Sequence, residues 1–414
     1  MTTEAALVTL IPPMPTAPTT CCIIGGGPAG MMLGFLLARQ GIAVTVLEKH
    51  KDFFRDFRGD TIHPSTLQLL YELGLLDKFL SLPHSQVSSL SASIGGETFP
   101  IADFSHLPTR CKFIALTPQW NFLNFLAEQA AHLPSFTLRM SWEATGLLQQ
   151  NGVTTGVRAN TPEGPVEIPA TLTVGCDGRH AISREAARLP LINEGVPIDV
   201  LWLRIDRQPQ DPENALGYIN YGRLIVLINR NDYFQIAYII AKGTFPQIQQ
   251  AGIPAFQQSI ERIVPFLAGR AGEIDSWDKV KLLTVQLNRL REWSSPGLLC
   301  IGDAAHAMSP VGGIGINIAL QDAVATANML TESLLSGTLT EHNLASVQHY
   351  RQNAVRNTQR VQAFAHGILD RVLRSDGPIK PPLAIRILTR IPGFQNIPAR
   401  FVGMGLQPQH IKYP

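Results

Sequence analysis

The sequence predicts an α/β protein in which a Rossmann-like dinucleotide-binding domain carries an inserted β-rich substrate domain and ends in C-terminal helices. Three observations support this fold class. A glycine-rich turn joins a short apolar strand to a helix near the N-terminus, and two later segments place an aspartate beside glycine at the end of a strand. Between these two segments, residues 196–290 are rich in strand-forming and aromatic residues.

Composition narrows the class of protein before any motif is considered. Of the 414 residues 45% are hydrophobic and 16% are charged, so the chain can bury a substantial core. Lys and Arg number 34 against 32 Asp and Glu, a balance that implies no nucleic acid as partner. No apolar run reaches the roughly 18 residues that a membrane-spanning helix requires. Residues 1–19, broken by four prolines, are expected to form a flexible leader.

Five cysteines without a C-x-x-C spacing predict neither a disulfide framework nor a metal site. Four of them lie in or beside predicted strands, where cysteine behaves as a small buried hydrophobic residue. This usage favours a reducing, cytoplasmic location.

The first motif begins with residues 21–24, a short apolar run typical of a strand that is buried on both faces. Gly25, Gly27 and Gly30 then fill the positions of G-x-G-x-x-G. Glycine at these positions permits a sharp turn, the approach of the backbone to a pyrophosphate, and close packing of helix on strand. The motif therefore predicts a dinucleotide site, and on its own it does not separate FAD from NAD.

A helix from Pro28 to Gln40 is expected to follow, with Gly41 after its end. Its first-turn amides and dipole would face the phosphates. The next strand ends at Glu48, 18 positions beyond Gly30 and close to the roughly 20 at which an acid meets a ribose hydroxyl.

The segment after Glu48 predicts two more helices, over residues 64–74 and 119–131, and strands of an additional sheet within residues 86–116. Arg58 is placed either to return to the nucleotide phosphates or to form a surface salt bridge. The amide of Gln119, in the first turn of its helix, would meet a ligand or solvent.

The second aspartate segment follows a strand predicted over residues 171–174. Asp177, beside Gly178, suits either a ligand site or an ordinary Asx turn, and a helix is expected near Ser183.

The β-rich stretch predicts strands over residues 201–205 and 223–240, with a turn at 229–232. Such a sheet forms a natural roof for a substrate pocket. Its aromatic residues, each of which suits the core or the pocket lining, are Trp202, Tyr221, Tyr233, Phe234 and Tyr238.

The third motif is a strand over residues 297–301 followed by Gly302 and Asp303 and by a glycine-rich loop, 312–317, that leads into a helix expected from Ala319 to Leu335. An aspartate at the carboxyl end of a strand is where an open α/β sheet presents ligand contacts. A glycine-rich loop at a helix N-terminus offers amides to an anionic group. His306 is expected to be structural, since no second ligand stands at metal spacing.

The C-terminal region predicts a long amphipathic helix over residues 341–374 and then a tail rich in Pro, Ile and Leu. Its basic residues Lys380, Arg386, Arg390 and Arg400 lie beside apolar ones, which suits a membrane surface. A tail packed on the body of the protein, without membrane contact, is the expectation.

These segments in this order resemble the class A flavin-dependent monooxygenases, the flavoprotein aromatic hydroxylases of the p-hydroxybenzoate hydroxylase fold. The resemblance covers roughly residues 20–375 and depends on three motifs in a fixed order. It implies FAD as cofactor and NAD(P)H as electron donor. The residues that it assigns to cofactor binding are Gly25, Gly27, Pro28, Ala29, Gly30, Glu48, Lys49, Arg58, Gln119, Asp177, Gly302, Asp303, Pro310, Gly313, Gly315, Ile316 and Asn317.

The resemblance also implies individual roles. Glu48 would hold the adenosine ribose, and Asp177 would serve both FAD and NAD(P)H. Asp303 would bond the flavin ribityl chain or phosphate, Pro310 would lie beside the ring, and the loop 312–317 would face the N1/O2 edge of the flavin.

The implied reaction is hydroxylation of an aromatic or other electron-rich small molecule with O2 and NAD(P)H through a flavin C4a-hydroperoxide. A dehydrogenase or an isoprenoid-type reductase of the same fold is the alternative. The Trp-x-Trp-x-Ile-Pro stretch of halogenases is absent. Rough alignment assigns Trp202, Arg204, Gln235 and Tyr238 to the substrate pocket, and no catalytic base is assigned.

The predicted boundaries and assembly complete these expectations. The protein would be a monomer or a homodimer. The FAD-binding domain would be discontinuous, over residues 20–85, 110–185 and 290–340; the β-rich substrate domain would span 86–109 and 190–289; and the C-terminal helical region and tail would span 341–414.

Overall fold

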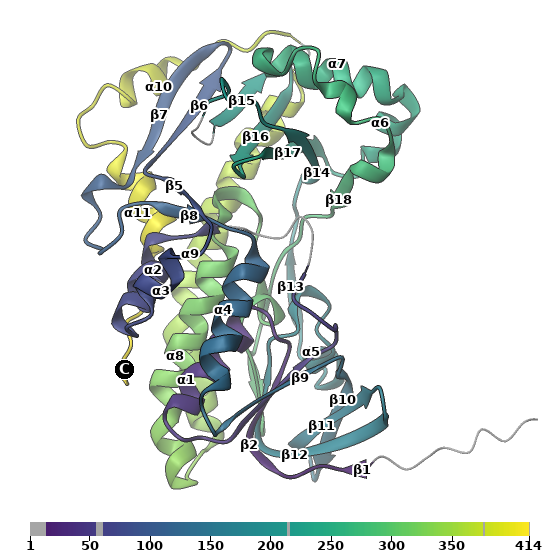
Figure 1. The fold of residues 1–414 in the computed structure, drawn as a ribbon, viewed down its shortest axis with the longest axis vertical. Helices are drawn as coiled ribbons and strands as arrows, with labels where there is room; N and C mark the ends of the chain where they lie inside the picture. Colours follow the sequence, from purple (N-terminus) through teal and green to yellow (C-terminus); the bar gives the residue numbers. More distant parts are fainter. Residues whose placement is uncertain (1–13, 55–60, 213–215, 376, 414) are drawn as a thin grey trace, which may run out of the picture.

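The computed structural model describes residues 14–54, 61–212, 216–375 and 377–413 (Figure 1). A nine-stranded sheet lies at one end of the molecule and a seven-stranded sheet at the other, and two long helices run beside them (Figure 1). This is the mixed α/β architecture that the sequence predicts.

The nine-stranded sheet has a parallel centre, in which β9, β3, β2 and β12 are neighbours and β21 also pairs with β12. Its central strand β2 is buried along nearly its whole length, as its apolar sequence predicts. Its strands are β1 (Met14–Pro15), β2 (Thr19–Ile24), β3 (Val44–Glu48), β9 (Phe136–Met140), β10 (Glu143–Gln150), β11 (Val153–Thr161), β12 (Gly164–Gly175), β20 (Ser294–Ser295) and β21 (Leu298–Cys300).

The expectation of a flexible leader over residues 1–19 is wrong from Met14 onward. Met14 and Pro15 form β1, which pairs in parallel with β12, and the Thr16 amide donates to the Glu167 carbonyl over 3.0 Å. Residues 1–13 lie outside the described part of the chain. The edge of β12 fixes this short strand because its backbone groups are available for pairing.

Helix α1 (Pro28–Arg39) packs against this sheet at close range. A β-carbon on Gly34 would lie 2.8 Å from Val46 and 2.9 Å from Phe136, so only glycine lets the helix approach β3 and β9 this closely. Helices α4 (Gln119–Ala131) and α8 (Gly315–Ser336) pack along α1. The bounds of α4 are those predicted from the sequence.

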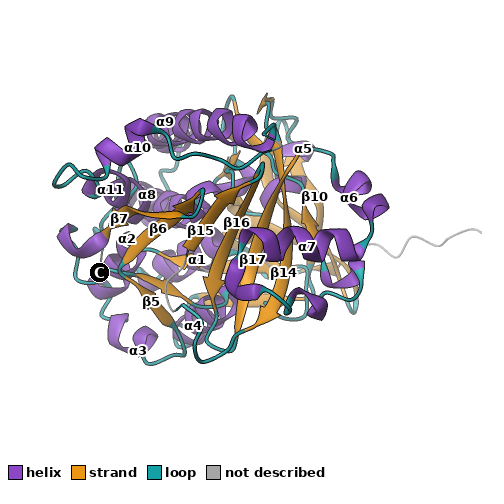
Figure 2. Ribbon diagram, turned by 90° about the horizontal axis from the view of Figure 1, so that it is seen from above, coloured by secondary structure: helices purple, strands orange, loops and turns teal. Residues whose placement is uncertain are grey.

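The seven-stranded sheet combines segments from distant parts of the chain in the order β18-β14-β17-β16-β15-β6-β7. Helices α6 (Phe245–Ala251) and α7 (Ile253–Ile263) belong to one side of it, and α9 crosses the other side (Figure 2). The predicted strand pair with its turn at 229–232 is confirmed. The strands are β6 (Ser89–Ile94), β7 (Glu97–Asp103), β14 (Ile198–Asp206), β15 (Leu216–Asn220), β16 (Arg223–Asn229), β17 (Tyr233–Ala241) and β18 (Lys281–Leu283).

Helix α9 (Glu341–Leu373) runs from the end of α8 to the seven-stranded sheet (Figure 1). Its 33 residues correspond to about 50 Å. A capping box between Thr340 and Asn343 begins it, and its bounds match the prediction. The predicted start of α8 at Ala319 is wrong. The helix begins at Gly315, directly after Ile314, whose φ of −88° and ψ of −7° already lie in the right-handed helical region.

The remaining elements form two three-stranded sheets and several short helices. The strands are β4 (Thr61–Ile62), β5 (Ser85–Val87) and β8 (Ile114–Leu116) in one sheet, and β13 (Leu191–Glu194), β19 (Leu287–Leu290) and β22 (His306–Ala307) in the other. The helices are α2 (Pro64–Glu72), α3 (Leu76–Leu80), α5 (Ile182–Ala186), α10 (Leu383–Leu388) and α11 (Asn396–Met404). Within the described ranges, no helix combines the length and apolar character needed to cross a membrane.

Candidate cofactor and substrate site

The glycine turn after β2 has the geometry that the motif predicts. Gly25 has a φ of +105°, and a β-carbon there would lie 2.5 Å from the Cys176 carbonyl oxygen. A β-carbon on Gly30 would lie 2.0 Å from the Gly25 carbonyl oxygen, whereas none of the described atoms lies within 4 Å of one on Gly27. The turn is therefore tightly packed at its first and third glycines and open at the second, where a ligand's phosphates would approach.

The first turn of α1 offers backbone donors on this open side. Its N-cap is Gly27, and no side chain caps it. Pro28, Ala29 and Gly30 are its first residues. Uncapped amides at a helix N-terminus favour an anion.

Glu48 ends β3 beside this turn. Its carboxylate accepts from the Gly26 amide over 3.1 Å and from the His50 amide over 3.0 Å. Lys49 is exposed next to it. Gln119 begins α4, which packs along α1. Arg58 lies outside the described residues.

The third motif approaches the same turn. Gly302 has a φ of +59°, and a β-carbon there would lie 3.3 Å from Ala29 and 3.2 Å from Ala319. The Gly302-Asp303 turn therefore lies between the starts of α1 and α8. Sequence positions 29 and 302 are thus brought into contact, as the prediction of one shared site requires.

The second aspartate segment joins this group through an ion pair. The Arg179 Nε atom lies 3.3 Å from Oδ2 of Asp303. Asp177 itself accepts from the Ser183 amide over 3.0 Å and from the Ser183 hydroxyl over 2.7 Å. Burial raises the pKa of Asp177 above its usual value, although the two Ser183 bonds oppose the shift. Asp177 thus forms the local turn that the sequence allowed and also lies within the site.

The glycine-rich loop, residues 312–317, is held by β4. Gly312 and Gly313 have φ values of +83° and +63°, and Thr61 donates to the Gly313 carbonyl over 3.1 Å. At the start of α8, Asn317 accepts from the Thr66 hydroxyl over 2.6 Å. Its amide nitrogen is buried without a partner among the described residues. A buried, unused donor of this kind suits a ligand acceptor atom.

A row of buried polar residues on α9 fixes the chain just before this loop. The Gln362 amide accepts from the Ser309 amide over 3.1 Å and donates to the carbonyls of Ser309 and Val311 over 2.9 and 3.0 Å. His366 Nε2 lies 2.7 Å from the Ser309 hydroxyl. Pro310 is therefore held from both sides. These contacts could not be predicted from the sequence, because their partners are 50 or more residues apart.

Asp322 of α8 fixes the Gly302 turn in a similar way. It accepts from the Gly302 amide over 3.2 Å, from His306 Nε2 over 2.6 Å and from Arg351 Nε over 2.9 Å. Burial opposes its ionisation, but His306 and Arg351 hold the pKa of Asp322 below its usual value. His306 lies in this network, and the described residues contain no group of three or more His, Cys, Asp or Glu side chains that could hold a metal ion.

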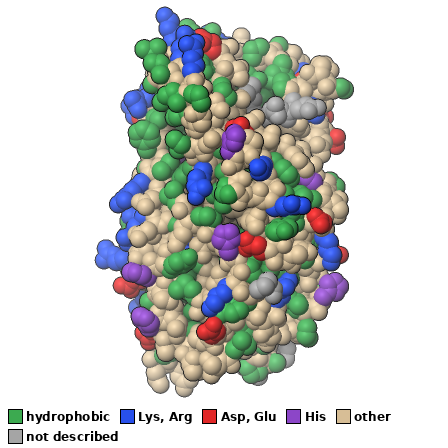
Figure 3. Space-filling view, turned by 90° about the vertical axis from the view of Figure 1, so that its left-hand side faces the viewer, with side chains coloured by type: hydrophobic (Ala, Val, Ile, Leu, Met, Phe, Trp, Pro, Cys, Tyr) green, Lys and Arg blue, Asp and Glu red, His purple; other side chains and the backbone are tan. Residues whose placement is uncertain are grey.

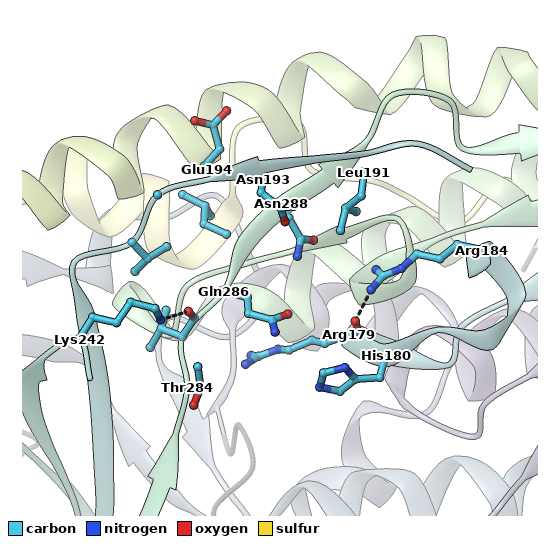
Figure 4. Close-up of a pocket in the computed structure, with 14 residues that line it drawn as sticks. Arg179, His180, Arg184, Leu191, Asn193, Glu194, Lys242, Thr284, Gln286 and Asn288 are labelled. Carbon is cyan, nitrogen blue, oxygen red and sulfur yellow. Dashed lines mark hydrogen bonds between the residues drawn. The ribbon is translucent and has the colours of Figure 1, made fainter. Parts of the chain in front are cut away.

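A groove of about 500 Å³ is lined by residues that follow the Asp177 segment, Arg179, His180 and Arg184, and by residues of the seven-stranded sheet and its neighbours (Figure 4). Arg179 and His180 enter it from the turn after β12, and Lys242 from the end of β17. Lys242 also bonds Asp199 over 3.0 Å. Besides these basic side chains and Arg184, the groove is lined by one acidic side chain, Glu194. The excess of basic side chains suits an anionic ligand. Arg179, His180 and Lys242 are not among the site residues predicted from the sequence.

The predicted pocket residues divide between two faces of the seven-stranded sheet. Trp202, Arg204 and Gln235 share one face, since Arg204 is paired with Gln235 and side chains alternate along β14. Tyr238 points to the opposite face, where it packs with Phe256 of α7 and bonds the Ser259 hydroxyl over 3.0 Å. The assignment of Tyr238 to the pocket is therefore wrong, because its register places it in the core.

The three residues on the shared face differ in exposure. Trp202 and Gln235 are mostly buried, and Val311, directly before the glycine-rich loop, packs against the same side of the sheet. Arg204 is exposed, pairs with Asp206 over 2.9 Å and lies over the Tyr233 ring. The face therefore meets the loop at Trp202, while Arg204 lies toward solvent.

Cys21, Cys22 and Cys300 are buried, as the sequence predicts, whereas Cys176 is only half-buried. Every cysteine of the chain lies in the described part and has a free thiol. Burial raises the pKa of Cys22 and of Cys300 to about 12, so both are neutral.

One known protein family and several individual proteins match this chain. A model of the family described as "FAD binding domain" matches residues 18–362. The chain is 29% identical over 388 residues to a 6-methylpretetramide 4-monooxygenase of Streptomyces rimosus, covering 93% of this chain and 92% of that protein. It is 27% identical to a dialkyldecalin synthase of Streptomyces rugosporus, covering 74% of this chain and 63% of that protein.

Seven curated relatives after the first, including the dialkyldecalin synthase, are longer than this chain, whose match spans only 56–63% of their length. Among solved structures, a probable FAD-dependent monooxygenase, PqsL of Pseudomonas aeruginosa, superposes with a TM-score of 0.74 at 19% identity. That match covers 86% of this chain and 98% of the other. At this identity the likeness shows a shared fold.

Proposed function

The chain belongs to the FAD binding domain family, and from this premise we propose that it is an FAD-dependent monooxygenase that hydroxylates an aromatic or other electron-rich small molecule. The observation that carries the proposal is the convergence of three distant motifs on one turn, where Gly25 packs against Cys176 and Asp177 and Gly302 packs against Ala29. The similarity to the 6-methylpretetramide monooxygenase, over almost the full length of both chains, supports the reaction class.

The residues present fit FAD. The open side of Gly27, the uncapped amides of α1 and the buried, unused amide nitrogen of Asn317 are features that a dinucleotide would use. When bound, FAD would supply electron transfer from NAD(P)H to O2 and the transfer of one oxygen atom to the substrate.

The protein side of this chemistry is binding, orientation and exclusion of water. Glu48 and Lys49 would face the adenosine ribose, and Gln119 and Asp303 would face the central part of the cofactor. Pro310 and residues 313–317 would border the ring, and α8 would direct its N-terminal amides toward it. Arg58 is proposed from the resemblance alone.

The groove of Figure 4 is our proposed approach for the electron donor. NAD(P)H carries at least two negative charges on its phosphates; Arg179 and Lys242 would supply complementary charge, and His180 would supply a hydrogen-bonding group. Because Arg179 also pairs with Asp303, it lies between the groove and the proposed FAD site.

The substrate would bind against the sheet face that carries Trp202 and Gln235. The relative named for 6-methylpretetramide supports a polycyclic aromatic substrate. The indole ring of Trp202 on this face would stack on the substrate, and the buried amide of Gln235 would provide one hydrogen-bonding group. Tyr238 is excluded from the substrate pocket because it lies on the opposite face of the sheet.

A dehydrogenase or isoprenoid-type reductase of the same fold is the second candidate. We keep this second candidate because one relative is named dialkyldecalin synthase, and that name describes no oxygenation. We also keep the predicted domain boundaries, a cytoplasmic location and a monomer or homodimer as proposals.

The proposal is tested by activity on a defined substrate. The purified protein would be supplied with FAD, NADPH or NADH, ¹⁸O2 and 6-methylpretetramide or related phenolic polyketides. The expected product is heavier by one ¹⁸O atom. Asp303→Asn should abolish FAD retention, and Asp278→Asn, an exposed aspartate on a surface turn, is the matched control. NAD(P)H-dependent reduction or dehydrogenation of a substrate without ¹⁸O would support the second candidate.

A further inference from the structure

The tail of the chain divides into a packed part and an exposed part. From α11 onward it is fixed to the body: Gln321 donates to the Met404 carbonyl over 3.0 Å, and Arg351 to the Gln407 carbonyl over 3.0 Å. This part fulfils the expectation of a tail packed on the body. The segment before it, residues 380–391, behaves differently.

Helix α10 and the turn after it present apolar side chains to solvent. Leu383, Ile387 and Ile391 are 71%, 53% and 48% exposed. Leu383 and Ile387 are four positions apart and therefore lie on one side of the helix. Isolated exposed hydrophobic residues are ordinary, but several on one short element indicate a contact surface.

This segment is nevertheless held in place. The Ile379 amide donates to Asn220 over 3.0 Å, and Arg386 pairs with Glu97 of β7. A β-carbon on Gly95 would collide with the Ile379 carbonyl, so the chain runs directly against the β6–β7 turn. The backbone is thus anchored to the seven-stranded sheet while the apolar side chains face outward.

The charged side chains of the tail, residues 377–414, are all basic. Residues 377–414 contain five Lys or Arg and no Asp or Glu, a net charge of +5, whereas the whole chain carries +2. Lys380, Arg386 and Arg390 flank the three apolar residues and are exposed. Figure 3 shows hydrophobic and basic side chains gathered at the top of the molecule, where α10 lies, with an acidic side chain beside them. We call the six residues at 380, 383, 386, 387, 390 and 391 the α10 surface.

We propose that the α10 surface docks the protein on a membrane that contains anionic lipids. Apolar side chains surrounded by basic ones, with no acidic residue in the segment, match the boundary between acyl chains and anionic head groups. A second copy of this chain fits less well, because a two-fold contact would bring two such basic segments together. The proposal concerns attachment at the surface and is independent of the proposed reaction.

The test is co-sedimentation of the FAD-loaded protein with vesicles. One set consists of equal parts of phosphatidylglycerol and phosphatidylcholine, and the other of phosphatidylcholine alone. We expect binding to the anionic set that weakens as salt is added, and little binding to the neutral set.

Two double variants separate the charged from the apolar contribution. Lys380→Gln/Arg390→Gln, which leaves Arg386 and its Glu97 contact in place, should weaken binding about 30-fold. Leu383→Gln/Ile387→Gln should weaken it about tenfold or more. The controls are Leu335→Gln, equally exposed on the last turn of α8, and Lys281→Gln/Arg291→Gln, which removes two exposed charges elsewhere.

Each outcome decides the proposal. Unchanged flavin content in every variant shows that all of them fold. Failure of the wild-type protein to sediment with anionic vesicles would overturn the proposal, as would equal binding to neutral vesicles. So would dimerisation in vesicle-free solution that the Leu383→Gln/Ile387→Gln variant abolishes, because the surface would then join two copies of the chain.

Discussion

Arg351 of α9 donates from Nε to Oδ1 of Asp322 of α8 over 2.9 Å, and both side chains are excluded from solvent. The same carboxylate accepts from the amide of Gly302. One buried ion pair thus links two long helices to the turn that carries Asp303. A pair of this kind is sensitive to the loss of one partner, since the remaining charge stays buried.

Replacing Arg351 with Met should therefore destabilise the protein by roughly 3–5 kcal/mol. Urea unfolding measures this change. Arg356→Met, on the exposed side of the same helix, should change the free energy of unfolding by less than about 0.5 kcal/mol. The double variant Asp322→Asn/Arg351→Met should recover part of the loss. A decrease of less than about 1 kcal/mol in the free energy of unfolding for Arg351→Met would show that the ion pair does not stabilise the packing of α8 and α9.

Replacing Gln362 with Leu should weaken FAD binding about tenfold while leaving the fold intact. The substitution removes three hydrogen bonds to residues 309 and 311, directly before the glycine-rich loop. Fluorescence titration of the apoprotein with FAD measures the affinity. Asn353→Leu, an exposed position on the same helix, is the control. Equal affinities in the two variants would contradict a role of α9 in positioning the loop.

Stability should fall between about pH 6.5 and pH 4 because of His63. Burial lowers the pKa of His63 to about 4, so the unfolded chain binds a proton in this range before the folded one does. Stability is then fully present above pH 6.5 and is lost as the pH falls, by about 3 kcal/mol in all. Urea unfolding at several pH values measures this loss. His63→Gln should flatten the profile, and an unchanged slope would locate the titrating group elsewhere.

Replacing Arg179 with Gln should raise the KM for NAD(P)H about tenfold or more. The side chain contributes charge to the groove and pairs with Asp303, so FAD affinity should fall by a smaller factor. Steady-state NAD(P)H oxidation gives the KM. Arg158→Gln, an exposed arginine paired with Glu167 far from the groove, is the control. A loss of FAD affinity without a change in KM would assign Arg179 to the cofactor alone.

Local sequence signals predicted the helices and strands better than the contacts between them. The glycine turn, Glu48 and the ends of α4 follow from spacing and capping residues, which depend on near neighbours. The start of α8 at Gly315 was missed because glycine disfavours helix interiors, and here two glycines with positive φ precede the first turn.

The errors at the site have a common physical origin in long-range packing. A shift of one residue along a strand moves a side chain to the opposite face of the sheet. Only the pairing of β17 with β14 decides which face Tyr238 occupies. The Gln362 and Arg351 contacts join residues 29 to 53 positions apart along the chain. Lys242 enters the groove from β17 with no motif around it. None of these relations leaves a periodic trace in the sequence.

The most direct test of the account is to follow the flavin absorbance in a stopped-flow instrument when the anaerobically reduced protein meets oxygenated buffer. The account predicts a transient whose spectrum matches neither the reduced nor the oxidised flavin, followed by the oxidised spectrum. A direct return to the oxidised spectrum, with phenolic substrates present as well as without them, would contradict the monooxygenase assignment and favour a dehydrogenase or reductase. The absence of any flavin spectrum after FAD is added would contradict the cofactor site itself.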